Sequence, residues 1–139
     1  MPKSSKGQKR WQYHVFISHS SLDAWVAKAM AEKVEALGAE CWFDEKDLAG
    51  GDVIAAEIIR GINACHEAII LISPNSVKSQ WVPFEIGGAR AQRKRITPIL
   101  SNVKQMAPLK DIKAIDLNSF DDFLAQLKRR ISEMRRKKV

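Results

Sequence analysis

Five consecutive apolar residues, Ala68-Ile69-Ile70-Leu71-Ile72, limit the fold of this chain more than any other feature. The run follows the charged Glu67 and ends at Ser73-Pro74-Asn75, a sequence that breaks regular structure. It is far shorter than the roughly 20 residues that a transmembrane helix needs. A strand without polar alternation is expected where helices cover both faces of a parallel sheet. The run therefore predicts a buried strand over residues 67–72 in an α/β protein.

Strand-like and helix-like segments alternate along the rest of the chain. Short segments rich in β-branched and aromatic residues favour strands, and apolar residues spaced by three and four favour helices. The predicted strands are 13–18, 41–43, 67–72, 95–100 and 113–117. The predicted helices are about 22–37, 54–62, 80–92 and 120–134. This order predicts a flavodoxin-like three-layer sandwich, in which a central parallel five-stranded sheet carries helices on both faces.

Local signals predict where several elements begin. Ser20 and Asp23 have the spacing of a capping box at the start of the first helix. The apolar stripe of that helix begins at Leu22. Ser79 is expected to cap the third helix. Pro98 cannot donate a ladder hydrogen bond, so we expect it on an edge strand or near a strand end.

Basic residues concentrate at the two ends of the chain. The net charge is +7, but residues 11–127 hold 12 basic and 15 acidic residues. We interpret 1–12 as a basic N-terminal tail, 13–134 as one domain and 135–139 as a basic C-terminal tail. Such charge runs are usually solvated, and no specific nucleic-acid site is predicted. A weak, salt-sensitive attraction to nucleic acid or to an anionic membrane is the alternative.

The sequence predicts a cytoplasmic protein without a membrane span. Residues 1–10 lack the apolar segment of a secretory signal. Cys41 and Cys65 are far apart and lack the spacing of a zinc site, so we expect buried free thiols in a reducing compartment. No metal is expected, because the histidines also lack regular metal-site spacing. They are His14, His19 and His66.

Polar residues gather where the predicted strands end. In sheets of this class, ligands bind beyond the carboxyl ends of the strands. The segments at that edge are 19–20, 44–52 and 73–85. Neither GxGxxG nor GxxxxGKS/T occurs, so a Rossmann dinucleotide site and a P-loop are both unsupported. A phosphoreceiver site at Asp44 is disfavoured, because the first strand ends at His19 and Ser20 rather than at an acidic pair.

Trp81 and Glu85 form the pair at that edge that most resembles a binding site. Four residues apart, they share one face of the predicted helix. If Ser79 caps this helix, both lie near its N-terminus, where the dipole and unpaired amides favour anions. An aromatic ring beside a carboxylate offers a stacking surface and an acceptor for ribose hydroxyls. The alternative, which the spacing leaves open, is that Trp81 packs on the sheet and Glu85 is solvated.

Several motifs, in the right order, resemble those of Toll/interleukin-1 receptor (TIR) domains. VFISHS at 15–20 resembles the first box of that family. WFD at 42–44 and LAGGD at 48–52 resemble the second strand and the BB loop. LISP at 71–74, SQW at 79–81, Glu85 and TPI at 97–99 resemble the third strand, the helix with the catalytic glutamate, and the fourth strand. The sequence is thus similar to TIR domains of the bacterial or plant-like NAD+-cleaving type over about residues 13–131.

The resemblance implies cleavage of the nicotinamide–ribose bond of NAD+, an activity of many TIR domains. It implies Glu85 as the catalytic residue, with NAD+ as substrate and with no separate cofactor. His19 stands where many members have tyrosine, and no arginine follows it. The implied substrate-binding residues are Trp81, His19, Ser20, Phe16, Asp44, Gly51 and Asp52.

Two functions are consistent with the resemblance. In an NAD+ nucleosidase, the carboxylate would stabilise an oxocarbenium-like ribosyl group, which water or an internal nucleophile then captures. The product would be ADP-ribose or a cyclic isomer. The biological role would be signalling in immune or anti-phage defence. The alternative is a non-enzymatic adaptor that acts by homotypic TIR–TIR contacts. The family implies self-association through the BB loop, residues 44–52, and an unidentified sensor or activator.

Overall fold

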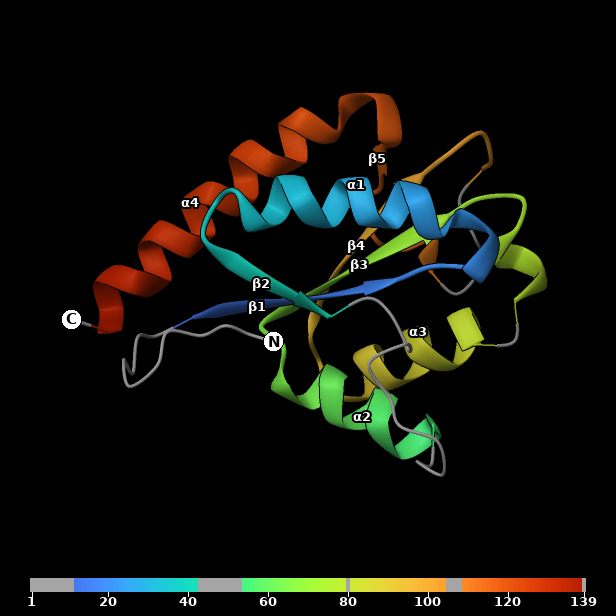
Figure 1. Ribbon diagram of the computed structural model, residues 1–139, viewed down its shortest axis with the longest axis horizontal. Helices are drawn as coiled ribbons and strands as arrows, with labels where there is room; N and C mark the ends of the chain where they lie inside the picture. The colour runs from blue at the N-terminus through green and yellow to red at the C-terminus, as the bar shows by residue number, and fades with distance from the viewer. Residues whose placement is uncertain (1–11, 43–53, 80, 105–108, 139) are drawn as a thin grey trace.

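Five parallel strands form one sheet in the order β2-β1-β3-β4-β5 (Figure 1). The computed structural model describes residues 12–42, 54–79, 81–104 and 109–138. All four strand pairs are parallel. The strands are β1 (Tyr13–Ser18), β2 (Ala39–Trp42), β3 (Glu67–Ile72), β4 (Arg95–Leu100) and β5 (Ile115–Asp116).

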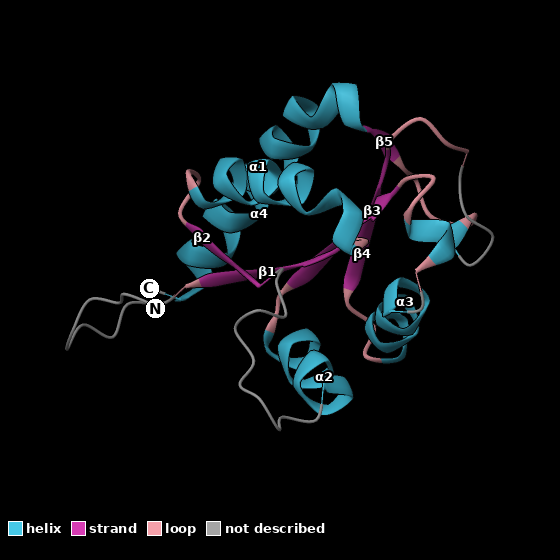
Figure 2. Cartoon of the chain, turned by 45° about the vertical axis from the view of Figure 1, so that its right-hand side comes forward, coloured by secondary structure: helices cyan, strands magenta, loops and turns pink. Residues whose placement is uncertain are grey.

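Helices cover both faces of this sheet, which confirms the predicted flavodoxin-like three-layer sandwich (Figures 1 and 2). On one face lie α1 (Ala24–Glu35) and α4 (Phe120–Lys138), and on the other lie α2 (Ile54–Ala64) and α3 (Trp81–Ala91). Three short 3-10 turns complete the described chain. They are η1 (Ser21–Asp23), η3 (Ser76–Lys78) and η5 (Leu117–Ser119).

The alternation of side chains along β1 divides the core between the two faces of the sheet. Val15 and Ile17 pack with the apolar residues of α1 and α4. Phe16 packs with those of α2 and α3. Every residue of β3 is buried, because helices cover this strand from both sides. The apolar run that predicted a central strand therefore lies in the interior of the sheet.

The start of the first helix differs from its prediction. Ser20 does act as a cap, because its Oγ accepts a hydrogen bond from the Leu22 amide at 3.2 Å. The capped element is η1, however, and α1 begins only at Ala24. Leu22 therefore lies outside the α-helical stripe and is 72% exposed, so its predicted place in the core is wrong. Asp23 is buried and bonds to another part of the chain, described below.

Several predicted boundaries shift by a few residues. Strand β2 begins at Ala39 rather than at residue 41, and the predicted last strand, 113–117, shortens to β5. Helix α4 continues to Lys138 through residues that the sequence analysis assigns to a tail. Pro98 lies inside β4, an inner strand, and pairs with Ile70 of β3, so its predicted place on an edge strand or near a strand end is wrong. Among the described residues, β5 pairs with Ile99 and Leu100 but not with Pro98. The amide hydrogen that Pro98 lacks therefore leaves no acceptor on β5 without its ladder bond.

A buried ion pair ties α4 to the amino ends of β1 and β3. The Glu67 carboxylate, fully buried, accepts bonds from Arg130 Nε at 2.9 Å and Arg130 Nη2 at 2.8 Å. The Tyr13 hydroxyl donates to the same carboxylate at 2.5 Å. Burial, and then the bond to Glu67, raises the pKa of Tyr13, so the hydroxyl remains a donor. Arg130 also lies 5.8 Å above the Phe123 ring.

Both cysteines are free thiols, as predicted, although Cys41 is only half-buried. Burial raises the pKa of the Cys65 thiol to about 11 and also raises that of Cys41. Because the thiolate is the reactive form, both thiols should resist Ellman's reagent in the folded protein near pH 8. Denaturation with guanidinium should release both. Fast labelling of Cys65 in the folded protein would contradict its burial.

The raised thiol pKa also predicts a loss of stability at alkaline pH. An unfolded thiol titrates near 9.0 and the folded Cys65 thiol near 11, so above about pH 9 the unfolded chain binds fewer protons than the folded one. The free energy of unfolding should therefore fall as the pH rises from about 9 towards 11. Urea denaturation across this range measures the slope, and Cys65→Ala should make it shallower.

Candidate functional site

Glu85 lies in the second turn of α3, a helix that begins at the carboxyl edge of the sheet (Figure 1). Its side chain is buried, with the residue only 8% exposed. The Ser18 hydroxyl, at the last position of β1, donates a hydrogen bond to Oε1 of Glu85. Ser18 itself is 1% exposed. The structure thus excludes the alternative in which Glu85 is a solvated surface residue.

The start of α3 is fixed by a side-chain cap. Ser79 caps the helix as predicted, because its Oγ accepts from the amides of Trp81 at 3.2 Å and Val82 at 3.3 Å. Glu85 follows in the second turn of the helix, one turn beyond the capped amides.

Trp81 precedes Glu85 by one helical turn and is half-buried. Its ring packs against the core beneath α2 and α3, which is the contact that the packing alternative predicted. It also meets the Phe84 ring edge-on, with the centroids 5.7 Å apart and an interplanar angle of 84°. Phe84 is 37% exposed. The first turn of α3 therefore carries two aromatic rings that are in contact with each other and partly open to solvent.

His19 and Ser20 follow Ser18 directly, in the loop between β1 and η1. His19 Nδ1 lies 2.8 Å from the Ser20 carbonyl oxygen. A carbonyl can only accept, so Nδ1 carries the proton in this contact. Ser20 is 5% exposed, and its oxygen already serves as the cap of η1. Both residues lie at the same strand end as Ser18, as predicted, with Ser20 committed to the turn.

Phe16 lies deeper than its predicted role requires. It shares a face of β1 with Ser18 but is 1% exposed, and its ring stacks on Trp42 with the centroids 5.0 Å apart. Phe16 is thus a core residue on the same face of β1 as Ser18, and its ring is not an open surface for a ligand. Three other predicted site residues lie outside the described part of the chain. They are Asp44, Gly51 and Asp52.

Ser18 and Trp42 belong to motifs that resemble the family, but neither was predicted to be a site residue. Ser18 had a weak signal, since it is the polar end of the otherwise apolar segment 15–18. Its bond to Glu85 joins residues 67 positions apart in the chain, which no local pattern reveals. Trp42 could be found only through its pairing with Phe16 across β1 and β2.

A second network holds the loops of this edge together. The buried Asp23 carboxylate accepts from the Ser73 hydroxyl at 2.5 Å and from Asn75 Nδ2 at 2.8 Å. Ser73 Oγ in turn accepts from the amides of Asn75 and Ser76. These bonds connect η1 to the turn that follows β3 and leads into α3. The capping-box prediction for Asp23 is therefore wrong, and its actual role is to join two loops.

Loss of this carboxylate should weaken the fold. We expect Asp23→Ala to lower the free energy of unfolding by about 1.5–3 kcal/mol, because buried donors on Ser73 and Asn75 lose a charged acceptor. Urea denaturation measures the change. Glu32→Ala, an exposed acidic position on α1, is the matched control and should change stability by less than about 0.5 kcal/mol. Equal effects in the two variants would argue against the network.

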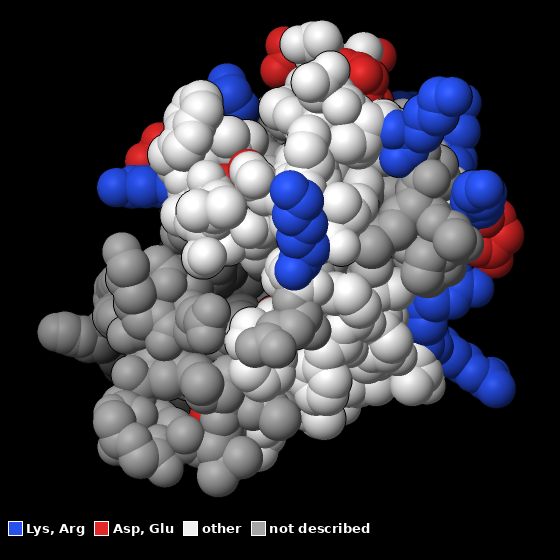
Figure 3. Space-filling view, turned by 90° about the vertical axis from the view of Figure 1, so that its right-hand side faces the viewer, with Lys and Arg blue, Asp and Glu red and all other residues white. Residues whose placement is uncertain are grey.

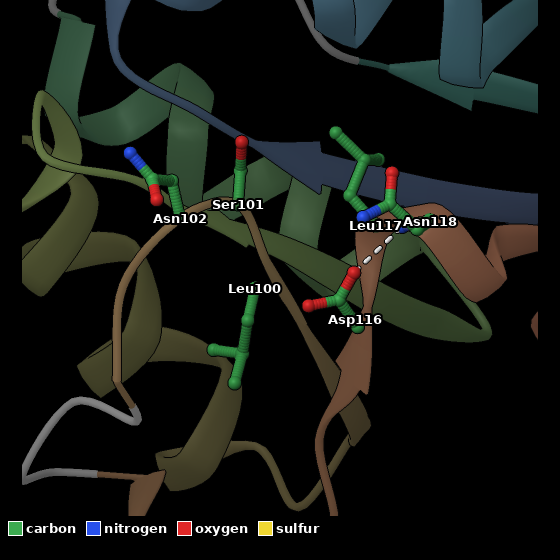
Figure 4. A pocket seen from close by; sticks show the side chains of 6 residues that line it. All are labelled: Leu100, Ser101, Asn102, Asp116, Leu117 and Asn118. Atoms are coloured by element: carbon green, nitrogen blue, oxygen red, sulfur yellow. Dashed lines mark hydrogen bonds between the residues drawn. The ribbon is translucent and has the colours of Figure 1, made fainter.

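A shallow groove lies at the carboxyl ends of β4 and β5, apart from Glu85 (Figure 4). The Asp116 carboxylate in it accepts from the Asn118 amide at 2.8 Å and so caps η5. The same end of the molecule, seen in Figure 3, shows many uncharged residues over the described surface, with basic side chains in the centre and at both edges and acidic ones at the top and right. The groove is lined by Leu100, Ser101, Asn102, Asp116, Leu117 and Asn118.

No group of three or more His, Cys, Asp or Glu side chains with metal-binding geometry exists among the described residues. His14 and His66 contact each other, and the His14 amide donates to His66 Nδ1 at 2.9 Å. His14 also lies 3.4 Å from Glu40. His14 lies at the amino end of β1, and His66 lies just before β3. Both are away from Glu85, which lies near the carboxyl end of β1.

The order of strands, the capped α3 and the buried glutamate agree with one family. The sequence profile of the TIR domain matches residues 15–131. This chain belongs to the TIR family. The match spans every described strand and helix from within β1 to within α4, so the domain accounts for nearly all of the described fold.

Curated relatives of this TIR domain include two bacterial enzymes and an animal receptor. It is 33% identical over 130 residues to the 2' cyclic ADP-D-ribose synthase BtTIR of Bacteroides thetaiotaomicron, covering 84% of this chain and 45% of that protein. It is 32% identical over 98 residues to the NAD(+) hydrolase PdTIR of Paracoccus denitrificans, and this match covers 67% of this chain and 33% of that protein. It is also 32% identical over 80 residues to human Toll-like receptor 1, and this match covers 57% of this chain and 10% of that receptor. The chain spans less than half the length of each of these relatives.

A solved structure supports the fold assignment. The TIR domain of the Toll-related receptor TRR-2 from Hydra magnipapillata superimposes with a TM-score of 0.72 at 21% identity, over 89% of this chain and 99% of that one. At this identity the likeness concerns the fold alone. In the described part of the TIR domain, no helix has both the length and the apolar character to cross a membrane.

Proposed function

We propose that this TIR domain is an NAD+ nucleosidase that cleaves the bond between nicotinamide and ribose. The observation that carries the proposal is the buried Glu85, held by Ser18 at the carboxyl edge of the sheet beside Trp81. The bacterial relatives named as a cyclic ADP-ribose synthase and an NAD+ hydrolase support the same chemistry. In this proposal NAD+ is the substrate, and no separate cofactor takes part.

The physical task of the site is to stabilise positive charge on the ribose. Nicotinamide leaves from a cationic ring, so the bond can break before a nucleophile attacks, and the ribosyl group then resembles an oxocarbenium ion. A fixed carboxylate in a site with little water stabilises this charge more strongly than one in bulk water. Glu85 meets that requirement because it is 8% exposed and bonded to a strand residue. Its carboxylate would accept bonds from the ribose hydroxyls.

The neighbouring residues would bind the rest of the substrate. The partly open rings of Trp81 and Phe84 offer surfaces on which a heterocycle can stack. His19, one residue beyond Ser18, lies on the loop at the same edge. Asp44, Gly51 and Asp52 remain proposed substrate-binding residues. Whether water or an internal nucleophile captures the ribosyl group determines the product, which is ADP-ribose or a cyclic isomer.

We propose further that the active form is self-associated through the BB loop, residues 44–52, and that a sensor or activator controls it in the cytoplasm. A role in immune or anti-phage defence would follow.

Nicotinamide release from NAD+ tests the proposal. The purified chain at high concentration, and the same chain fused to an oligomerising partner, are incubated with NAD+, and the products are separated by chromatography. We expect nicotinamide from at least the clustered form, and the second product would distinguish hydrolysis from cyclisation. Intact NAD+ in both samples, with folded protein, would rule the activity out.

A non-enzymatic adaptor is the second candidate. The similarity to human Toll-like receptor 1 supports it, as do the exposed apolar side chains of Leu22 and Trp25, which are 72% and 77% exposed. An adaptor would signal through contacts between TIR domains and leave NAD+ untouched. A cellular response that persists in a variant without NAD+ cleavage would favour this candidate.

A further inference from the structure

Ser18 is an unusual residue to find buried at the end of a central strand. It is 1% exposed and follows Val15, Phe16 and Ile17, all of which are core residues. A buried hydroxyl without a hydrogen-bond partner destabilises a fold. The partner of the Ser18 hydroxyl therefore explains why a serine is tolerated at this buried position. The partner is the Glu85 carboxylate.

The two elements that meet in this bond differ in rigidity. Ser18 pairs with Ile70 of β3 in the parallel ladder, so the backbone that carries its hydroxyl is held inside the sheet. Glu85 extends from α3 on a flexible side chain with three rotatable bonds. The strand therefore provides a fixed donor, and the carboxylate is the group that this donor orients.

We propose that Ser18 is a positioning residue for NAD+ cleavage, which fixes the orientation of the Glu85 carboxylate by donating to Oε1. This inference rests on the proposed function of the site. A donor to a carboxylate forms a charge-assisted bond, which is stronger than a bond between neutral groups. Because Ser18 holds Oε1, the orientation of the whole Glu85 carboxylate group is restricted. Catalytic groups tolerate little displacement, and an error near 1 Å can reduce a rate by about 100-fold.

Four variants test this role in enzyme kinetics. Ser18→Ala should lower kcat for NAD+ by about 10- to 100-fold with KM little changed, because the effect concerns the reacting group rather than substrate affinity. Ser18→Thr retains the hydroxyl and should recover most of the rate, while Ser18→Cys retains a weak donor and should be intermediate. Thr97→Val removes a buried hydroxyl from β4, away from Glu85, and should keep the wild-type kcat.

A spectroscopic measurement keeps the test independent of turnover. The ¹³C resonance of the Glu85 carboxyl group, assigned with Glu85→Gln, should move in Ser18→Ala, return towards its wild-type position in Ser18→Thr, and stay unchanged in Thr97→Val. If the wild type does not cleave NAD+, the proposed function fails, and this resonance still decides whether Ser18 orients Glu85. A resonance and a kcat that are the same in Ser18→Ala and the wild type, in folded protein, would overturn the inference.

Discussion

Glu85→Gln is expected to abolish most NAD+ cleavage, lowering kcat by at least about 100- to 1,000-fold. Glutamine keeps the shape of the side chain and an oxygen that can accept from the Ser18 hydroxyl, but it removes the negative charge. In the proposed mechanism that charge stabilises the developing ribosyl cation, so its loss affects the transition state more than substrate binding. The rate of nicotinamide release, measured at saturating NAD+, gives the change in kcat.

The fold should tolerate this substitution. Burying a charged group is costly and an amide is cheaper to bury, so Glu85→Gln should melt at or above the temperature of the wild type. Glu133→Gln, which makes the same chemical change at an exposed position of α4, is the matched control and should retain full activity. Turnover in Glu85→Gln equal to that of the wild type would remove Glu85 from the mechanism.

Arg130→Ala should have the largest effect on stability, lowering the free energy of unfolding by about 3–5 kcal/mol. The substitution leaves the Glu67 carboxylate buried without its counter-ion, because Glu67 is fully buried and receives both bonds from Arg130. The Tyr13 hydroxyl would remain its partner. Packing of the Arg130 stem and its contact with Phe123 would also be lost. Urea denaturation followed by circular dichroism measures the change.

Two further variants separate the charge effect from the packing effect. Arg129→Ala removes a neighbouring exposed arginine of α4 and should change stability by less than about 0.5 kcal/mol. The triple variant Tyr13→Phe, Glu67→Leu, Arg130→Leu removes every polar partner together. It should be more stable than Arg130→Ala, because no uncompensated charge stays buried. If Arg130→Ala were as stable as the wild type, water would have to reach the Glu67 carboxylate readily.

The layers of this fold could be predicted because they depend on local patterns. The run 68–72 predicts burial from both sides, and β3 is buried at every position. The Ser79 cap and the four-residue spacing of Trp81 and Glu85 follow from helix geometry, which is the same wherever the helix lies. These features need no knowledge of what the segment packs against.

The sequence by itself thus determined the order of elements, the three layers and the candidate carboxylate. Only the tertiary structure decided that Ser18 holds Glu85, that Asp23 joins Ser73 and Asn75, and that Arg130 pairs with Glu67. Each of these contacts joins residues 50 or more positions apart in the chain, and each depends on β1 and β3 being neighbours in the sheet or on which helix covers them. Periodicity reports which face of an element is buried, but the partner on the other side is set by how the elements pack in space.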